Sequence, residues 1–252
     1  MKKNTKRRGD GRMAVFVPEN GSFPKYFKAA ARFAHFFSAT LTLCASAKFV
    51  SERPRKIDFY RELLEEYAVQ HDIQWDLRIY EDAPSVFLKR LVQAEDFAMV
   101  LRDDDLDLTT ELLQQSSVPV LVIPQSYDQP FRRVLLASAG GRLSDRALGI
   151  AVRLGISGSC KVEVLTVSPA SSPALRMVHD KAKYFFDKYN VKATYKIEQG
   201  HMKKTILRSC ESKETSLLVL GANETDHWKD HRFRSFSEDV VDAAICPVLV
   251  VK

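Results

Sequence analysis

Short apolar runs alternate with longer amphipathic segments along almost the whole chain. The runs Leu217–Leu220 and Pro247–Val251 are typical, because each is fully apolar and too short to form a helix. Strands of this kind are expected in a parallel sheet that is covered on both faces. The segments between the runs carry apolar residues at helical spacing, as Ala147, Ala151 and Leu154 do. The pattern therefore predicts an α/β protein of strand–helix–strand units with right-handed crossovers.

Five strands separated by helices are predicted in the first half of the chain. The expected strands are Val15–Val17, Leu41–Ala45, Ile73–Ile79, Phe97–Leu101 and Val118–Ile123. The expected helices are one capped by Ser22 that carries Phe27, Ala30, Ala34 and Phe37, then Ile57–Gln70, a helix after Asp82, and Leu108–Gln115.

The second half repeats this order of elements. Its expected strands are Val134–Ala137, Val162–Val167, Val191–Ile197, Leu217–Leu220 and Pro247–Val251. Its expected helices are a stripe through Ala147–Leu154 that ends with Gly155 as the C′ residue, then Ala174–Tyr189, a helix after Gly200, and Ser235–Ala244. Ser235 and Glu238 have the spacing of a capping box at the start of the last helix.

The spacing of corresponding strands indicates a tandem duplication. Val134 follows Val15 by 119 positions, and Val219 follows Val100 by the same number. Pro247 follows Pro119 by 128 positions, so the second half gains about nine residues between its fourth and fifth strands. We therefore expect a domain over residues 13–127 and a second domain over residues 128–252, joined by the linker Gln125–Pro130.

The positive charge of the chain is concentrated at its beginning. The formal net charge is +6, and residues 1–12 contain six basic residues against one acidic residue, so the remainder is nearly neutral. This distribution predicts a short, disordered basic tail over residues 1–12 and no domain specific for nucleic acid. A weak electrostatic contact of this tail with anionic lipid or nucleic acid is the alternative.

Hydropathy and cysteine usage suggest the compartment. No apolar stretch reaches the roughly eighteen residues of a membrane span, so none is expected. The four cysteines are scattered without a C-x-x-C pair, and each lies in or beside an apolar pattern; they are Cys44, Cys160, Cys210 and Cys246. Reduced thiols of this kind favour a cytoplasmic protein.

Several segments, taken in order, resemble the universal stress protein family as two tandem copies. In the second half these are Arg133–Ala137 with Gly140 and Gly141, Val162–Leu165, Leu217–Gly221, Ser235–Val240 and Cys246–Val251. In the first half they are Val15–Ser22 and Val118–Ile123. The resemblance implies two tandem doubly wound domains, each a five-stranded parallel sheet of order 3-2-1-4-5 with helices on both faces. It also implies a cytoplasmic stress-response or regulatory protein.

The sequence departs from the ATP-binding pattern of that family, which is G-x-x-G, nine residues, then glycine and serine or threonine. Gly221 and Ser235 fit, but Glu224 and Arg234 replace the other two glycines. The acidic position after the first strand holds Ala139 in the second half and Asn20 in the first. The first half also lacks the loop, because only 17 positions separate Arg102 from Pro119. We therefore expect no nucleotide in the first domain.

Any retained ligand site is expected in the second domain. By resemblance, the residues that would line it are Ala137, Val167, Leu220, Gly221, Asn223, Arg234, Ser235 and Phe236. ATP, AMP or another anion is the candidate ligand, held by Arg234 and Ser235 at the start of a helix. The alternative is that Glu224 and Asp226 pair with the basic residues of this loop, and that nothing binds.

Other candidate chemistry in the sequence is weak. His227 and His231 have a spacing that could hold zinc on a helix, but they lie in a predicted loop, so solvation is favoured. Ser138–Asp145 is somewhat similar to the SGGxDS loop of the related ATP pyrophosphatases, with the order of its polar residues changed. No nucleophile, base and oxyanion set can be assembled, which disfavours an ATP-using enzyme of that superfamily.

The sequence therefore predicts a non-enzymatic, partner-binding regulatory module. The alternative is a nucleotide or anion sensor that uses the second domain alone. The two domains are expected to pair as an internal dimer of the family type. If Val118–Ile123 and Pro247–Val251 pair within one chain, the protein could be a monomer; if they pair between chains, it is a homodimer or larger.

Overall fold

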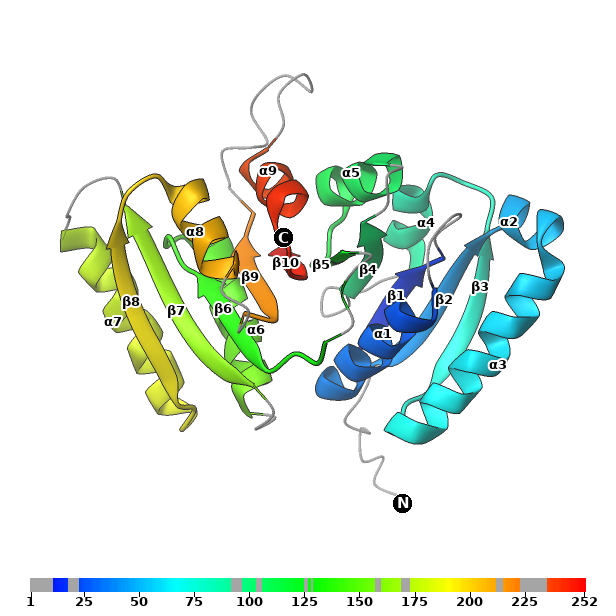
Figure 1. Ribbon diagram of the computed structural model, residues 1–252, viewed down its shortest axis with the longest axis horizontal. Coiled ribbons are helices and arrows are strands. Elements are labelled where there is room, and N and C mark those ends of the chain that lie inside the picture. The colour runs from blue at the N-terminus through cyan, green and yellow to red at the C-terminus, as the bar shows by residue number, and fades with distance from the viewer. Residues whose placement is uncertain are drawn as a thin grey trace, which may run out of the picture.

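The strands that the computed structural model describes form one continuous ten-stranded sheet (Figure 1). The structure describes residues 11–17, 23–91, 97–102, 106–124, 127, 129–156, 160–168, 173–211, 215–222 and 235–252. The strands are β1 Arg12–Phe16, β2 Thr40–Ser46, β3 Trp75–Tyr80, β4 Phe97–Arg102, β5 Val120–Pro124, β6 Arg133–Ala137, β7 Lys161–Ser168, β8 Ala193–Gln199, β9 Leu217–Gly221 and β10 Val248–Val251. Their order is β3-β2-β1-β4-β5-β10-β9-β6-β7-β8.

Strand pairing is parallel within each half and antiparallel where the halves meet. At the junction Leu121 of β5 lies opposite Leu249 of β10, with valine pairs on either side of them. The α/β class with mainly parallel pairing is therefore confirmed. Of the two arrangements left open for the fifth strands, the structure has pairing within one chain.

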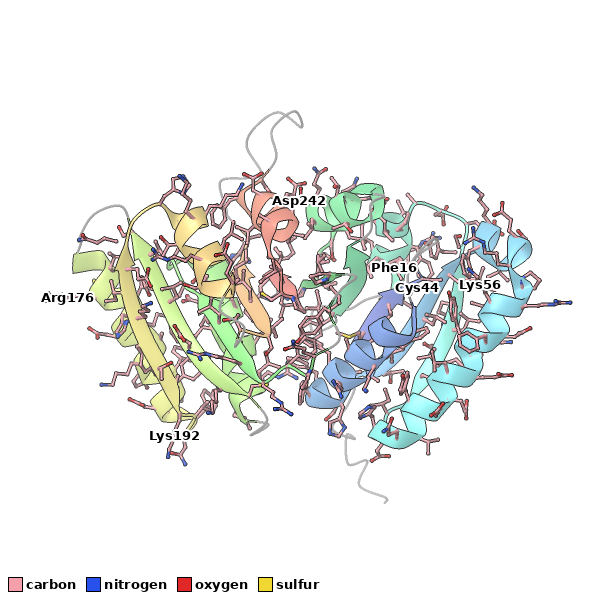
Figure 2. The ribbon with its side chains drawn as sticks, in the orientation of Figure 1. Phe16, Cys44, Lys56, Arg176, Lys192 and Asp242 are labelled. Atoms are coloured by element: carbon pink, nitrogen blue, oxygen red, sulfur yellow. The ribbon has the colours of Figure 1, made fainter. Side chains whose placement is uncertain are left out.

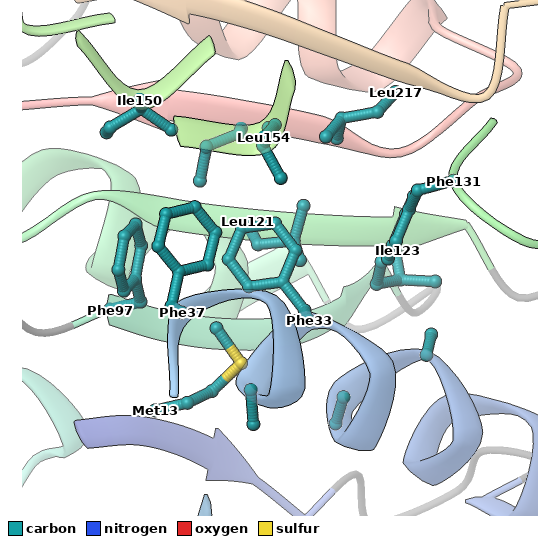
Figure 3. Close-up of a cluster of buried hydrophobic side chains, with 14 of the residues drawn as sticks. Met13, Phe33, Phe37, Phe97, Leu121, Ile123, Phe131, Ile150, Leu154 and Leu217 are labelled. Carbon is teal, nitrogen blue, oxygen red and sulfur yellow. The ribbon is translucent and has the colours of Figure 1, made fainter. Parts of the chain in front are cut away.

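Helices cover both faces of the sheet. One face carries α1 Phe23–Phe37, α2 Ala47–Glu52, α3 Pro54–His71, α6 Arg142–Ile156 and α7 Pro173–Lys188. The other carries α4 Pro84–Leu91, α5 Leu106–Gln115, α8 Met202–Glu211 and α9 Phe236–Ala243. Two apolar cores result, one on each side of the sheet, and each draws residues from both halves. Figure 3 shows Phe97 and Leu121 of the first half in the same cluster as Leu154 and Leu217 of the second.

The helix boundaries differ from the sequence prediction in two places. Helix α2 was not predicted, because its six residues are too few for a periodic pattern; Ser46 caps it by accepting a hydrogen bond from the Phe49 N–H at 3.1 Å. Gly155 lies inside α6 and is not a C′ residue. A Cβ atom at Gly155 would lie 2.3 Å from a methyl carbon of Val191, so close packing explains this glycine.

The predicted basic tail is too long by at least one residue, because Arg12 already belongs to β1. Its guanidinium lies 3.1 Å from the Asp76 carboxylate on β3 and also donates a hydrogen bond to Thr42 on β2. The charge of Arg12 therefore has a structural partner two strands away. Residues 1–10 lie outside the described residues.

The four cysteines are free thiols, as predicted, and Cys44, Cys210 and Cys246 are buried. No helix in the described part of the chain is long and apolar enough to cross a bilayer.

Candidate functional site

The second half keeps the outline of a ligand site where β6, β7 and β9 end. In an open parallel sheet, ligands bind outside the carboxyl ends of the strands, where the chain order reverses. Leu220 on β9 pairs with Ala137 on β6 at this point. The loop that follows β9 leads to the start of α9, whose N-terminal dipole would favour an anion.

The turn after β6 satisfies its own polar groups. Gly140 and Gly141 have φ angles of 87° and 85°, a conformation that favours glycine. The Ser144 hydroxyl lies 3.1 Å from the Ser138 hydroxyl and accepts a hydrogen bond from the Gly140 N–H at 3.3 Å. Both serines are buried. This turn therefore offers Ala139 and few polar groups to a ligand.

Gly221 is required for packing. A Cβ atom at this position would lie 2.7 Å from the carbonyl carbon of Leu143 and 2.8 Å from the Ser144 nitrogen. Both are backbone atoms at the start of α6, and they cannot move aside as a side chain could. The end of β9 thus approaches α6 so closely that only glycine fits, whether or not a ligand binds.

The start of α9 is occupied by the protein's own groups. Glu238 accepts a hydrogen bond from the Ser235 N–H at 2.5 Å, and the Ser235 hydroxyl accepts one from the Glu238 N–H at 3.2 Å. This is a complete capping box, as the sequence predicted. The Glu238 side chain also accepts a hydrogen bond of 2.7 Å from Gln114 of α5, in the other half of the chain. Glu238 is only 3% exposed.

The charge at this helix start is unfavourable for an anion. Glu238 and Asp239 both lie in the first turn of α9. Acidic groups there interact favourably with the positive end of the helix dipole, which a phosphate would otherwise use. Lys203 of α8 lies 3.1 Å from Asp239 and offsets part of this negative charge.

The structure brings together the apolar members of the predicted site. Ala137, Val167, Leu220 and Phe236 all belong to or pack against the core on the α8–α9 side of the sheet. Val167 and Leu220 are buried, so they are part of that core. Gly221 and Ser235 are half-buried beside it. Asn223 and Arg234, with Glu224, His227 and His231, lie outside the described residues, as does Asn20 of the first half.

Two buried hydroxyl groups were not singled out from the sequence, and one of them lies at the start of α9. The hydroxyl of Ser237, in the first turn of α9, is buried and has no hydrogen-bond partner within the described ranges. The Thr166 hydroxyl on β7 is in the same situation. Only the capping-box spacing pointed to this helix turn. Among the residues that the structure describes, no cluster of three or more metal-ligating side chains occurs.

The order of the elements and the parallel pairing within each half define a doubly wound α/β protein. Residues 130–252, just under half of the chain, match the Universal stress protein family. The predicted family is thereby confirmed for the second half, and it is a family of stress-response proteins. No curated protein matches the sequence.

Solved structures share the fold over nearly the whole chain. A universal stress protein from Archaeoglobus fulgidus has a TM-score of 0.75 and 17% identity, covering 95% of this chain and 98% of that one. A functionally unknown protein from Pseudomonas aeruginosa has a TM-score of 0.69 and 17% identity, covering 97% and 92%. The cytoplasmic domain of a prokaryotic cation chloride cotransporter has a TM-score of 0.64 and 12% identity, covering 96% and 95%.

Proposed function

We propose that the protein is a non-enzymatic regulatory module of the stress response that acts in the cytoplasm by binding a protein partner. It consists of two tandem universal-stress-protein-like domains that pair through β5 and β10 as an internal dimer. In this proposal the crevice of the second domain contributes to structure and is not a catalytic or nucleotide-binding centre.

The observation that carries the proposal is the position of Glu238. Its carboxylate occupies the start of α9, where the family's phosphate loop would deliver its ligand, and it is held there by Ser235 and Gln114. A nucleotide phosphate would have to approach a buried carboxylate, and like charges at short range in a protein interior repel strongly. Glu224 and Arg234 replace two glycines of the family pattern, and their side chains would keep a phosphate from approaching the backbone amides that could offset this repulsion.

The occurrence of the same fold in larger proteins supports a role as a module. One solved structure with this fold over nearly the whole chain is the cytoplasmic domain of a cation chloride cotransporter. A likeness at 12% identity concerns the fold alone. It is nevertheless consistent with a two-domain unit that works through contact with other protein parts.

Calorimetric titration with ATP, ADP and AMP in the presence of Mg²⁺ tests the proposal. We expect no binding up to millimolar nucleotide, and no nucleotide in mass spectra of the purified, denatured protein. The Glu238→Gln variant keeps a capping-box residue but removes the charge, so it separates repulsion from the missing glycines. Stoichiometric co-purified nucleotide, or wild-type binding at micromolar concentration, would contradict the proposal.

A second candidate function is an anion or nucleotide sensor that uses the second domain alone, with ATP or AMP as ligand. The Ser237 hydroxyl favours it, because this buried donor at the α9 start has no partner in the described part of the chain. A Ser237→Ala variant that loses measurable AMP or ATP binding, while unfolding at the wild-type urea concentration, would support this candidate over the first.

A further inference from the structure

An apolar groove of about 370 Å³ lies beside α6, on the face of the sheet that carries α1 and α7. The first half contributes Phe97 and Pro119 to it, from the starts of β4 and β5. Helix α6 contributes Arg146, Gly149, Arg153 and Ile156. Among the described residues that line the groove, none has an acidic side chain. It is far from the start of α9, which belongs to the opposite face of the sheet.

The same face of the corresponding helix in the first half is covered. Helices α1 and α6 have the same length of 15 residues, so Ala30, Ala34 and Phe37 correspond to Gly149, Arg153 and Ile156. The three residues of α1 are all buried, whereas the three of α6 are all exposed. Phe37 is 7% exposed and Ile156 is 56% exposed. The two halves therefore differ in what lies over this helix face.

In the first half Phe131, which follows the predicted linker, lies over α1, with Tyr127 stacked on it. The Phe131 ring packs edge-on against Phe33 of α1, with 5.9 Å between ring centroids, and Tyr127 stacks on Phe131 at the same distance. The Tyr127 hydroxyl donates a hydrogen bond of 2.9 Å to the Ser216 carbonyl, which directly precedes β9. Tyr127 and Phe131 thus place two aromatic rings beside α1, and a backbone group of the other half anchors them.

We propose that the groove beside α6 binds a short extended peptide of a partner protein, one that carries aromatic and acidic side chains. The proposal rests on the proposed function and names the surface and the chemistry of the partner. We infer aromatic side chains in the peptide from Phe131, which packs against Phe33 of α1. The residue of α6 that corresponds to Phe33 is Val152, and it lines the groove. The bound peptide would place aromatic rings on α6 as Tyr127 and Phe131 place them beside α1.

The acidic part follows from the charges that distinguish the two helices. Arg146 and Arg153 of α6 stand where α1 has Phe27 and Ala34. Arg146 already donates a hydrogen bond to the main-chain oxygen of Lys252, so we infer the acidic side chain of the peptide from Arg153. The Arg153 guanidinium is positioned over the Phe37 ring, 4.7 Å from its centroid. Arg153 lies at the rim of the groove, where a carboxylate of the peptide can pair with its guanidinium group. An uncharged apolar partner would gain nothing from the charge of Arg153.

The probe is a labelled peptide with the sequence QSYDQPF, which copies residues 125–131 and contains two aromatic residues and one aspartate. Binding to the full chain is measured by fluorescence anisotropy. The Gly149→Leu variant plugs the groove, because a Cβ atom at Gly149 meets nothing within 4 Å and the fold should tolerate it. Arg153→Glu reverses the rim charge. Arg176→Glu makes the same charge change on exposed α7, at the outer side of the molecule (Figure 2), and is the matched control.

We expect saturable binding by wild type and Arg176→Glu, and weakening of about tenfold or more with Gly149→Leu and with Arg153→Glu. A peptide with both aromatics replaced by alanine, and one with aspartate replaced by lysine, should each bind at least about tenfold more weakly. Circular dichroism and urea unfolding establish that the variants are folded.

The proposal is overturned if wild type fails to bind the peptide at millimolar concentration, or if Gly149→Leu binds it as well as wild type does. It is also overturned if sedimentation shows a dimer of this chain that Gly149→Leu dissociates, because a second copy would then be the occupant. Nucleotide binding in the calorimetric titration would refute the proposed function, whatever the peptide does. Absence of both nucleotide and peptide binding would refute only the groove.

Discussion

Gln114 of α5 donates a hydrogen bond of 2.7 Å to Glu238, so the two halves meet at the helix start of α9 as well as at the sheet. We expect Gln114→Leu to lower the free energy of unfolding by about 1 to 3 kcal/mol, because a buried carboxylate loses a donor. Urea unfolding measures this. Gln70→Leu, an exposed residue of α3, is the control and should change stability by less than about 0.5 kcal/mol. Equal effects of the two variants would contradict the prediction.

Two glycines of α6 should respond in opposite directions to the same substitution. Gly149→Ala is expected to stabilise the protein by up to about 1 kcal/mol, since alanine is the better helix former and its methyl group meets open space. Gly155→Ala is expected to destabilise it by about 1 to 3 kcal/mol, because the new methyl group would overlap Val191. Thermal unfolding of both variants checks the signs. A stabilising Gly155→Ala would show that Val191 moves freely.

The leucine pair at the junction of the halves should be energetically coupled. Leu121 and Leu249 are both fully buried and lie directly opposite each other on β5 and β10. Each change to alanine should destabilise the protein by about 2 to 5 kcal/mol. In a double-mutant cycle the pair should show a coupling of about 0.5 kcal/mol or more, whereas Leu43→Ala combined with Leu249→Ala should be additive. Wild type should unfold in urea as one transition, and two separate midpoints would refute an energetically continuous sheet.

Acid should weaken the contact between β1 and β3. Burial alone would raise the pKa of Asp76, but hydrogen bonds from Thr42 and Arg12 and the charges of Arg12 and Arg78 outweigh it and lower that pKa. A carboxyl group with a lowered folded-state pKa stabilises the protein above its unfolded pKa near 4, and this contribution is lost as pH falls through the folded value.

The Asp76→Asn variant should therefore be less stable than wild type at pH 7, and the difference should shrink below about pH 4. Unfolding free energies measured between pH 7 and pH 3 test this. Asp58→Asn changes an exposed carboxyl on α3 and should leave the pH dependence almost unaltered. A constant difference between wild type and Asp76→Asn across this range would contradict the assignment.

Most of the helices and strands could be predicted from the sequence, because the residue patterns that indicate them are local. The apolar runs that became β5 and β10 could be recognised without knowing their neighbours, and the spacing of Ser235 and Glu238 specified a capping box. The pairing of β5 with β10 could not be deduced, because two similar apolar strands can meet within one chain or between two. The hydrogen bond of Gln114 to Glu238 spans 124 positions, and no local pattern encodes it.

The candidate site was predictable only as an outline. Gly221 was recognisable as a family glycine, but its role depends on how closely the backbone of α6 approaches it. The exposure of Gly149 could not be predicted either, because Ala30, at the equivalent position of α1, is buried. What differs near the two helices is Phe131, which packs against Phe33 of α1.

The pairing of β5 with β10 also makes the association of the halves independent of dilution. Partners joined by a short tether meet at an effective concentration set by that tether, and separate subunits meet only at the concentration of the protein. A two-subunit assembly of this architecture would dissociate when few copies are present. Because β5 and β10 belong to one chain, the junction is expected to form at any protein concentration.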